Sequence, residues 1–244
     1  MTLYAIGDIH GQLDLLHAAH DRVAADRARE GAEHAPLVHV GDLVDRGPDS
    51  RGVVDLMIGL VAEDDRVTVL KGNHDNMFVL FAGPDPREDP HLRSDLSWLH
   101  PRLGGRDTLA SYGVDPDLPP TLLHRRIRAN VPVGHLQFLE NLPLAFPHED
   151  VLVVHAGVRP GVPLHHQTAQ DLTWIRDGFL DDLTDHGALV VHGHTTVDSV
   201  ELHPNRLALD TGAAYGGPLS AVAIEGREVY LLTDEGRKPV RPLR

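Results

Sequence analysis

Five short apolar runs divide the chain, and polar side chains follow each of them. The runs lie at residues 3–6, 37–40, 67–70, 151–154 and 188–191. Between the first three runs, apolar residues recur every three or four positions, which is typical of amphipathic helices. Alternating strands and helices indicate parallel strands joined by crossover helices. We therefore expect an α/β fold with helices over about 13–30 and 51–62 and another helix that begins near residue 76.

The segment at about residues 83–130 has a different character, because proline, glycine and charged residues are frequent in it. Apolar residues such as Trp98 interrupt it, so it is too apolar for a disordered linker. We expect a helical or irregular cap insertion over one edge of the site, within a single domain that spans residues 1–244. A further helix is expected over 133–141.

The C-terminal part of the chain contains short β-patterns separated by glycine and asparagine. Strands are expected at residues 197–203, 207–210, 219–224 and 229–232. The last residues form a basic, proline-containing tail, which is expected to be frayed. Its basic residues are Arg237, Lys238, Arg241 and Arg244.

The 244-residue chain carries 22 basic and 36 acidic residues, for a formal net charge of -14. This charge argues against broad binding to nucleic acid or to an anionic membrane surface. No stretch approaches the roughly 18 apolar residues of a membrane span, and the first residues lack the basic start of a signal peptide. There is no cysteine, so any metal must be held by oxygen and imidazole ligands. We expect a cytoplasmic protein without nucleic-acid or membrane partners, and the sequence leaves its oligomeric state open.

The seven residues from Gly41 to Gly47 combine two carboxylates and an arginine directly after an apolar run. Three charges at the end of a buried strand are unfavourable unless a metal, a counter-charge or an anionic ligand balances them. Alone, such a cluster would be interpreted as a loop ion pair between turn-forming glycines. The polar residues that follow the other apolar runs favour a shared site instead.

Each of the five apolar runs is followed by residues that can bind a metal. These residues are Asp8 and His10, Asp42, Asn73 and His74, His155, and His192 with His194. In open α/β sheets, ligands bind outside the carboxyl ends of the strands, so these side chains are expected to converge. Carboxylates, imidazoles and an amide without thiolates suit Mn, Fe, Zn or Mg. There are more ligands than one tetrahedral ion needs, and two ions about 3.5–4 Å apart that share a carboxylate are typical of hydrolysis at phosphorus.

Five motifs in a fixed order resemble those of calcineurin-like metallophosphoesterases. They are Gly7-Asp8-Ile9-His10-Gly11, Gly41-Asp42-Leu43-Val44-Asp45-Arg46-Gly47, Gly72-Asn73-His74-Asp75, His155-Ala156-Gly157 and Gly193-His194-Thr195. More narrowly, they are similar to the motifs of the phosphoprotein phosphatase family, above all its bacterial and phage (lambda phosphatase-like) members and the diadenosine tetraphosphatases. The resemblance implies two mixed β-sheets packed as a sandwich and flanked by helices, with a dimetal site at the carboxyl ends of the strands.

The resemblance also implies which side chains bind two divalent ions. Asp8 and His10 would bind the first ion, Asp42 would bridge, and the second ion would be bound by Asn73, His155 and His194. A bridging anion offsets the repulsion between two cations, and a neutral amide leaves the second ion a strong Lewis acid. Mn²⁺ is the first choice of ion, with Fe, Zn or Mg as alternatives. His192 is interpreted as a core or supporting residue in preference to a ligand.

The remaining motif residues are assigned to catalysis by the same resemblance. His74 would protonate the leaving oxygen, with Asp45 orienting its ring. Arg46 would hold phosphate oxygens through its bidentate guanidinium, and Asn73 would add to phosphate binding. All four residues lie in two of the five motifs.

A second phosphate-binding arginine is expected outside these motifs. Arg176 follows Trp174-Ile175 in a string that resembles the bacterial subgroup. Arg159 lies shortly after His155 and is the alternative. We therefore expect Arg176 to bind phosphate.

The implied activity is hydrolysis of a phosphomonoester by a hydroxide shared between two metal ions. Phosphoserine and phosphothreonine in proteins are the first-choice substrates, and symmetrical hydrolysis of bis(5'-nucleosyl) tetraphosphates is the alternative. Asp75, where eukaryotic protein phosphatases usually carry glutamate, favours the bacterial and dinucleotide-hydrolysing enzymes. A metal-binding regulatory module without catalysis is the third hypothesis, although such a module would not need His74, Asp45 and Arg46.

Overall fold

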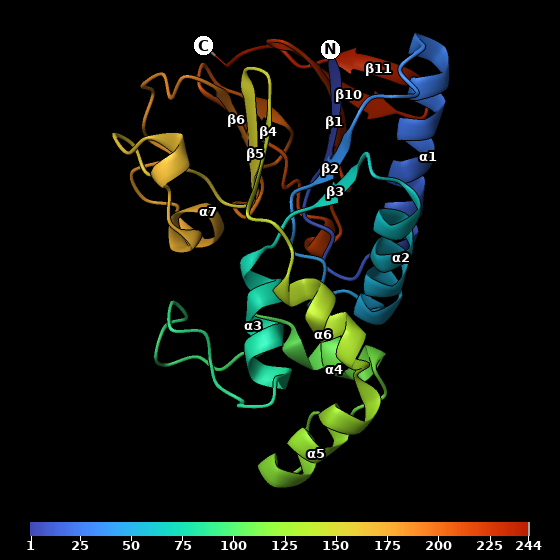
Figure 1. Cartoon of the computed structure of the whole chain (residues 1–244), viewed down its shortest axis with the longest axis vertical. Helices are drawn as coiled ribbons and strands as arrows, with labels where there is room; N and C mark the ends of the chain where they lie inside the picture. The colour runs from blue at the N-terminus through green and yellow to red at the C-terminus, as the bar shows by residue number, and fades with distance from the viewer. Residues whose placement is uncertain (244) are drawn as a thin grey trace.

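The computed structural model describes residues 1–243, in which two mixed β-sheets pack face to face (Figure 1). The first sheet has the strand order β11-β10-β9-β1-β2-β3, and the second has the order β4-β5-β6-β8-β7. The first comprises β1 (Thr2–Ile6), β2 (Leu37–His39), β3 (Val67–Val69), β9 (Ala221–Glu225), β10 (Glu228–Thr233) and β11 (Gly236–Pro239). The second comprises β4 (Ala145–His148), β5 (Val151–Val154), β6 (Leu189–His192), β7 (Glu201–Leu202) and β8 (Arg206–Ala208). The expected α/β class and two-sheet sandwich are confirmed.

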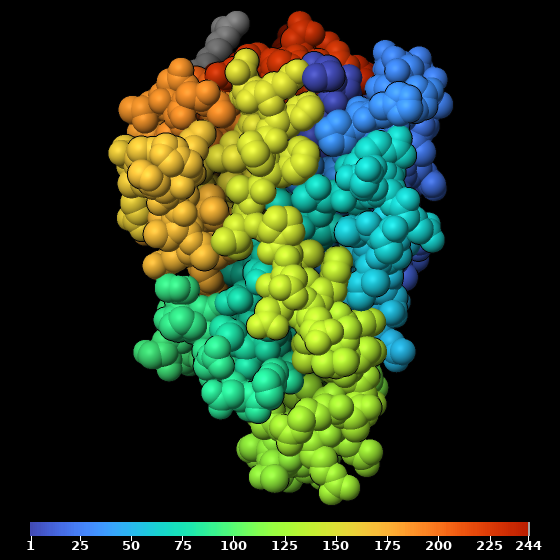
Figure 2. Space-filling view, viewed as in Figure 1, coloured from blue at the N-terminus to red at the C-terminus, as the bar shows by residue number. Residues whose placement is uncertain are grey.

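Helices cover the outer faces of both sheets and one end of the sandwich. Their bounds are α1 (Leu13–Glu30), α2 (Ser50–Glu63), α3 (Asn73–Ala82), α4 (Gly105–Ser111), α5 (Pro120–Asn130), α6 (Val133–Glu140) and α7 (Ala169–Trp174), with 3₁₀ turns at Leu164–His166 and Ala213–Tyr215. Helices α1 and α2 lie beside the first sheet, and α7 lies beside the second (Figure 1). Helices α3, α4 and α6 gather at the lower end, where α5 projects farthest from the sheets (Figures 1 and 2).

Parallel pairing brings the carboxyl ends of the central strands to one edge. Ala5 of β1 pairs with Val38 of β2, which pairs with Thr68 of β3, and all three strands run in parallel. In the second sheet, β5, β6 and β8 are also parallel. The chain segments that leave β1, β2, β3, β5 and β6 therefore start from the strand ends that the sequence predicts to carry the site.

The strands are continuously apolar because both of their faces are buried. In β1, Leu3 and Ala5 face the core between the two sheets, whereas Tyr4 and Ile6 face the core beneath the helices. In β5, Val153 lies in the inter-sheet core, and the residues on either side of it pack toward α7. Successive side chains of a strand point to opposite faces of the sheet, and here each face packs into a different core. Apolar residues are therefore not alternated with polar ones along these strands.

The segment at 83–130 packs against α3 through an aromatic cluster. The fully buried Trp98 stacks on Phe78 with ring centroids 5.4 Å apart and lies 4.9 Å from Phe81. Tyr112 lies 5.6 Å from Phe78 on the other side. Such aromatic contacts add to the free energy of burying the rings themselves. The segment contains α4 and α5, and the helix expected over 133–141 is present as α6.

The structure corrects the sequence-based boundaries at α3 and at the C-terminus. Helix α3 begins at Asn73 and not near residue 76, because the Asp75 carboxylate accepts a hydrogen bond from the Gly72 N–H at 2.9 Å and so stabilises an earlier first turn. The tail is not frayed at Gly236–Pro239, which is β11. There Arg237 forms ion pairs with Asp26 at 2.8 Å and Glu225 at 2.7 Å.

Two further boundaries differ from the expected ones. Strand β4 was not expected, since its pattern contains Pro147 and polar residues. Of the expected strand over 197–203, only Glu201–Leu202 pairs with β8. The basic residue Arg244 lies outside the described residues. Within residues 1–243, no helix is both long and apolar enough to span a membrane.

The buried His39 of β2 pairs with the partly buried His20 of α1, and this pair is expected to make folding stability depend on pH. The Nε2 atoms of His20 and His39 are hydrogen-bonded at 2.8 Å. Burial, with His20 adding to it, lowers the pKa of His39 to about 3. The unfolded chain therefore binds more protons below pH 6.5, so the stabilisation is complete above that pH and is lost as the pH falls toward 3.

We expect the free energy of unfolding to decrease by about 2 kcal/mol between pH 7.5 and pH 5 through His39 alone. In His39→Leu this contribution is absent, so the variant loses correspondingly less stability over the same interval, whatever its stability at pH 7.5. Urea unfolding of both proteins at the two pH values measures the difference. Equal losses in both proteins would contradict the assignment to His39.

Candidate functional site

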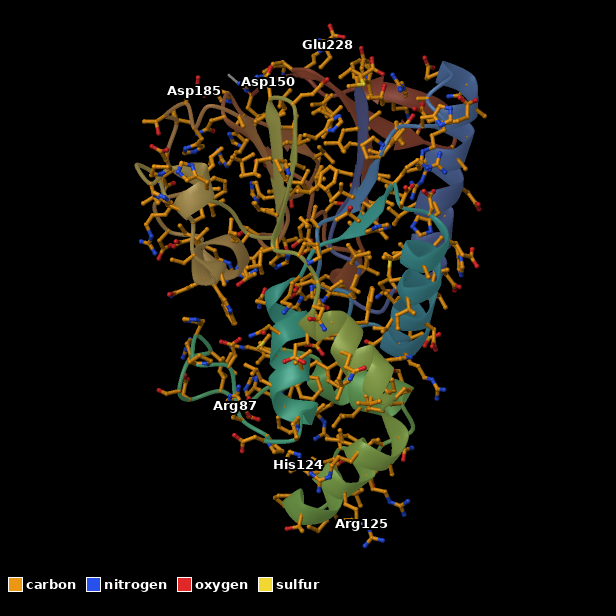
Figure 3. All side chains as sticks on the ribbon, in the orientation of Figure 1. Arg87, His124, Arg125, Asp150, Asp185 and Glu228 are labelled. Atoms are coloured by element: carbon orange, nitrogen blue, oxygen red, sulfur yellow. The ribbon has the colours of Figure 1, made fainter. Side chains whose placement is uncertain are left out.

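The polar residues that follow the five strands meet at one edge of the sandwich. Nearly all of them are buried, with Asp8, His10, Asp42, Asn73, His74, His155 and His194 each no more than 7% exposed. By contrast, charged residues such as Arg125, Asp150, Asp185 and Glu228 project from the surface (Figure 3). Burial of so many ionisable groups together is unfavourable unless they are partnered.

Asp42 is common to two groups of potential metal ligands. Its carboxylate lies with His10 and His74 in one group and with His155 and His194 in the other. Asp42 Oδ2 is 3.5 Å from His10 Nε2, and Oδ1 is 3.4 Å from His155 Nε2. A carboxylate in this position can be shared by two cations, as the sequence predicts for Asp42.

Asn73 adds an amide oxygen to the second group. Its Oδ1 is 3.0 Å from His155 Nε2 and 2.8 Å from His194 Nδ1. Asn73 occupies this position because it opens α3, whose preceding Gly72 lies against Asp42; a Cβ at Gly72 would come within 2.1 Å of Asp42 Oδ1. The glycine of this motif is therefore required by close approach to the site.

Asp8 approaches the same centre from β1. Its Oδ2 accepts a hydrogen bond from the His194 N–H at 2.9 Å, while its Oδ1 is buried without a hydrogen-bond partner among the described residues. A Cβ at Gly193 would meet this oxygen at 1.8 Å, so only glycine fits beside it. Burial, together with the nearby Asp210 and Asp42 carboxylates, raises the pKa of Asp8 well above its ordinary value.

The structure fits a pair of divalent cations at these residues. Asp8 Oδ1 and His194 Nε2 are both buried, and neither has a hydrogen-bond partner in residues 1–243. Burial lowers the pKa of His10, His155 and His194 below the ordinary histidine value, which leaves their imidazoles neutral and able to donate a lone pair. Oxygen and imidazole donors without sulfur suit a hard or borderline ion.

Asp42 remains an anion in this surrounding. Burial by itself would raise its pKa, but His155, His74 and His10 together lower it below the ordinary aspartate value. An ionised carboxylate at the centre of the two groups is the form that bridges cations most strongly.

Backbone strain is concentrated at the same residues. Five non-glycine residues of the site have positive φ angles: His10 (45°), Asp42 (51°), Asp45 (76°), Arg46 (68°) and His194 (63°). In the rest of the described chain only Glu149 shares this property. Such conformations cost of order 1–3 kcal/mol each and are concentrated where function requires them.

His74, Asp45 and Arg46 form a hydrogen-bonded set beside the metal-ligand groups. His74 Nδ1 lies 2.6 Å from Asp45 Oδ2, and the His74 Nε2 lies 2.8 Å from Arg46 Nη2. Because a guanidinium only donates, Nε2 accepts and Nδ1 donates to Asp45. Arg46 Nη1 also contacts His10. The structure thus brings the expected acid, its orienting carboxylate and the phosphate-binding arginine together.

A pocket of about 240 Å³ opens onto these groups. Its lining includes Asp42, Arg46, His74 and His194, and Arg176 lies on its wall with Nη2 donating to the His194 carbonyl at 3.2 Å. Arg159 is not part of this lining; it forms an ion pair with Asp171 at 2.5 Å.

His192 is held away from the two ligand groups. It is fully buried, its Nδ1 lies 3.0 Å from the Gly193 carbonyl, and its ring packs edge-on against Phe179 at 5.1 Å. Asp210, which also lines the pocket, accepts hydrogen bonds from the Thr196 hydroxyl at 2.9 Å and the Gly212 N–H at 3.0 Å.

The sequence reasoning missed three residues near the site. The exposed Tyr215 lines the pocket, with its ring 5.4 Å from the Arg46 guanidinium carbon. Trp98 and Thr108 both hydrogen-bond to Asp45 from the segment at 83–130. Trp98 and Thr108 lie in the segment that the sequence predicts as a cap insertion, where no motif marks them.

Comparison with known proteins supports a common origin for this arrangement. The family model for calcineurin-like phosphoesterases matches residues 1–218. The symmetrical bis(5'-nucleosyl)-tetraphosphatase of Dechloromonas aromatica is 29% identical, over 94% of this chain and 95% of that protein. The asymmetrical bis(5'-nucleosyl)-tetraphosphatase PrpE of Anoxybacillus flavithermus is 30% identical, over 89% and 88% of the two chains.

A solved structure of a cold-active protein tyrosine phosphatase has the same fold. It matches with a TM-score of 0.68 and 20% identity, over 99% of this chain and 79% of the other. The family match covers all five motifs and both groups of potential metal ligands. The chain therefore belongs to the calcineurin-like phosphoesterase family and is a metallophosphoesterase.

Proposed function

We propose that this enzyme hydrolyses dinucleoside polyphosphates at a centre of two divalent cations. The observation that carries the proposed chemistry is the position of Asp42, which belongs to both groups of metal ligands and lies beside the hydrogen-bonded His74 and Asp45. A centre that only held metals would not need an oriented histidine and an arginine next to it. Phosphoester hydrolysis uses all of these groups.

Each cation is assigned a set of side chains in this proposal. Asp8, His10 and Asp42 would hold the first ion, and Asp42 with Asn73, His155 and His194 would hold the second. The donor set favours Mn²⁺, with Fe, Zn or Mg as alternatives. When bound, the two ions would stabilise negative charge on phosphoryl oxygens and make water more acidic.

The remaining steps are performed by side chains of the chain itself. Arg46 and Arg176 would bind phosphoryl oxygens, since both line the pocket and a guanidinium matches their geometry. Asn73 would contribute its amide to the same phosphate. Once Arg46 binds phosphate in place of His74 Nε2, His74 would act in its imidazolium form. It would donate the Nε2 proton to the leaving oxygen, while its Nδ1–H stays hydrogen-bonded to Asp45 at 2.6 Å.

The substrate class rests on the relatives and on the surface next to the pocket. Both curated relatives named above are bis(5'-nucleosyl)-tetraphosphatases. A neighbouring hollow shares Arg176 with the pocket and is also lined by Trp174. Arginine and an indole suit a phosphate chain and a base. For these reasons, dinucleoside polyphosphates replace phosphoserine and phosphothreonine proteins as the first-choice substrate.

A panel of substrates tests this proposal. With added Mn²⁺, kcat/KM is compared for diadenosine tetraphosphate, a phosphoserine peptide, a phosphotyrosine peptide and an aryl phosphate. We expect diadenosine tetraphosphate to be preferred, and chromatography of the products separates symmetrical cleavage to two ADP from asymmetrical cleavage to AMP and ATP. Preference for the phosphoserine peptide would instead restore the protein phosphatase hypothesis.

Arg176 and Arg159 form a matched pair for testing phosphate binding. In Arg176→Ala, we expect kcat/KM for diadenosine tetraphosphate to fall about 10- to 100-fold, the amount expected for a lost hydrogen bond between charged groups. Arg159→Ala should change it less than about threefold, since this arginine is paired with Asp171 outside the pocket. Steady-state kinetics of the two variants measures the contrast. A larger loss in Arg159→Ala would reverse the assignment.

A further inference from the structure

Asp45 is a fully buried carboxylate whose two oxygens are hydrogen-bonded by three side chains. His74 Nδ1 lies 2.6 Å from Oδ2, the Trp98 indole N–H donates to the same oxygen at 2.9 Å, and the Thr108 hydroxyl donates to Oδ1 at 2.7 Å. An indole N–H has no lone pair to offer, so Oδ2 must act as an acceptor. Two of the three contacts therefore come from residues outside the five motifs.

The Thr108 hydroxyl also fixes the backbone of Asp45. It accepts a hydrogen bond from the Asp45 N–H at 2.8 Å, and the Ser50 hydroxyl accepts from the same N–H at 3.1 Å. Because the Thr108 oxygen already accepts from the backbone, its single proton is available for Asp45 Oδ1. The threonine thus holds both the main chain and the carboxylate of a residue with a φ angle of 76°.

Trp98 is held in place by the helix that carries His74. Its ring stacks on Phe78 and contacts Phe81, both on α3, whose first turn contains His74. Gly105 permits this packing, because a Cβ there would meet the Trp98 ring at 2.5 Å. One indole therefore links the helix of His74 to the carboxylate that orients His74.

A second glycine brings the same segment against the loop of Asp45. A Cβ at Gly104 would lie 2.2 Å from the Arg46 nitrogen, and the Gly104 carbonyl accepts a hydrogen bond from the Arg46 N–H at 3.3 Å. The segment predicted as a cap insertion thus contacts the backbone of Arg46 and the carboxylate of Asp45.

We propose that Trp98 and Thr108 are positioning residues for the catalytic acid. By donating to Asp45, they hold its oxygens as acceptors, so that the proton shared with His74 lies on Nδ1 and the Nε2 side faces the pocket. Without them, the carboxylate could turn within its cavity, and His74 would lose both its fixed orientation and its fixed tautomer. This proposal rests on the proposed function in one respect, which is the role of His74 as the acid.

The test uses variants that remove the hydrogen bonds to Asp45 and keep most of each side chain. Trp98→Phe keeps an aromatic ring but lacks the N–H, Thr108→Val replaces a hydroxyl with a methyl group, and Thr108→Ser keeps the hydroxyl. Each full-length protein is assayed with Mn²⁺ on a substrate with a poor leaving group, an alkyl phosphate or diadenosine tetraphosphate, and on 2,4-dinitrophenyl phosphate, whose leaving group needs no proton.

We expect kcat on the poor leaving group to fall about 10- to 100-fold in Trp98→Phe and in Thr108→Val. Activity on 2,4-dinitrophenyl phosphate should stay within about threefold of wild type. Thr108→Ser should restore most of the lost activity.

A second measurement does not depend on turnover. In the metal-free protein, ¹⁵N shifts of the His74 ring report its tautomer, which should be Nδ1–H in wild type and Thr108→Ser and mixed in Trp98→Phe and Thr108→Val. The proposal would be overturned if the His74 shifts of Trp98→Phe and Thr108→Val equalled those of wild type. It would also be overturned if these variants lost activity equally on both substrates and Thr108→Ser did not restore it. If wild type hydrolyses no phosphate substrate, the proposed function fails, and the ¹⁵N shifts still decide whether Trp98 and Thr108 position His74.

Discussion

In His74→Asn, kcat for diadenosine tetraphosphate should fall by about 10²- to 10⁴-fold, the range typical of a lost general acid. His74 lines the pocket, and its Nδ1 is held 2.6 Å from Asp45, so Nε2 is the ring nitrogen left to donate a proton to the leaving oxygen. Metal content should be retained, because Asp8, His10 and Asp42 remain to hold the first ion. Stopped assays of product formation, together with metal analysis of the same samples, measure both quantities.

Two controls show whether this loss reflects proton donation. On 2,4-dinitrophenyl phosphate, His74→Asn should retain activity within about tenfold of wild type, because that leaving group departs without a proton. The exposed His34 supplies a matched control, and His34→Asn should resemble wild type on both substrates. Unchanged turnover of the poor leaving group in His74→Asn would remove the acid role. Loss of bound metal would instead place His74 among the ligands, as its position beside His10 and Asp42 allows.

In Asp42→Asn, both cations should bind more weakly by more than about 100-fold, since even residues that only support metal ligands change affinity 10- to 100-fold. Asp42 is the one residue shared by the two groups of potential ligands in the described chain. Its replacement removes the negative charge that offsets repulsion between two cations. Isothermal titration with Mn²⁺ measures the affinities, and hydrolysis at limiting Mn²⁺ should fall in parallel.

The exposed Asp21 on α1 provides the control for a lost carboxylate elsewhere, and Asp21→Asn should bind Mn²⁺ as wild type does. Thermal unfolding of both variants without metal checks that the fold persists. If Asp42→Asn bound two ions at wild-type affinity with full activity, the bridging role would be wrong.

The central strands could be predicted because the sequence pattern that identifies them is confined to a few consecutive residues. Residues 151–154 are apolar without interruption and residues 37–40 are interrupted only by His39, since each strand is buried on both faces, and the polar residues follow directly. Parallel pairing brings Asp42 and Asn73 to one edge of the first sheet, and the packing of the two sheets brings His194 to the same place. A site built at strand ends is visible in sequence because each ligand follows its own strand.

Most of the structural features that the sequence did not predict depend on contacts between residues far apart in the chain. Arg237 belongs to an ordered strand because Asp26 and Glu225 receive its guanidinium, and neither partner is near it in the sequence. Trp98 contacts Asp45 across 53 residues, so nothing in the local pattern distinguished it from a core aromatic. The early start of α3, by contrast, has a local cause that periodicity also misses: a hydrogen bond from the Gly72 N–H to the Asp75 carboxylate. Sequence periodicity identifies strands and helices, but it does not identify these partners.

Metal stoichiometry measured together with activity tests the central claim most directly. Metal-free protein is titrated with Mn²⁺, and bound ions per chain and hydrolysis of diadenosine tetraphosphate are followed in the same samples. We predict two bound ions per chain, with hydrolysis rising as the second ion binds and disappearing when a chelator removes both. Full turnover in the chelator with no bound ion, or saturation at a single ion with full activity, would contradict a two-cation centre built on Asp42.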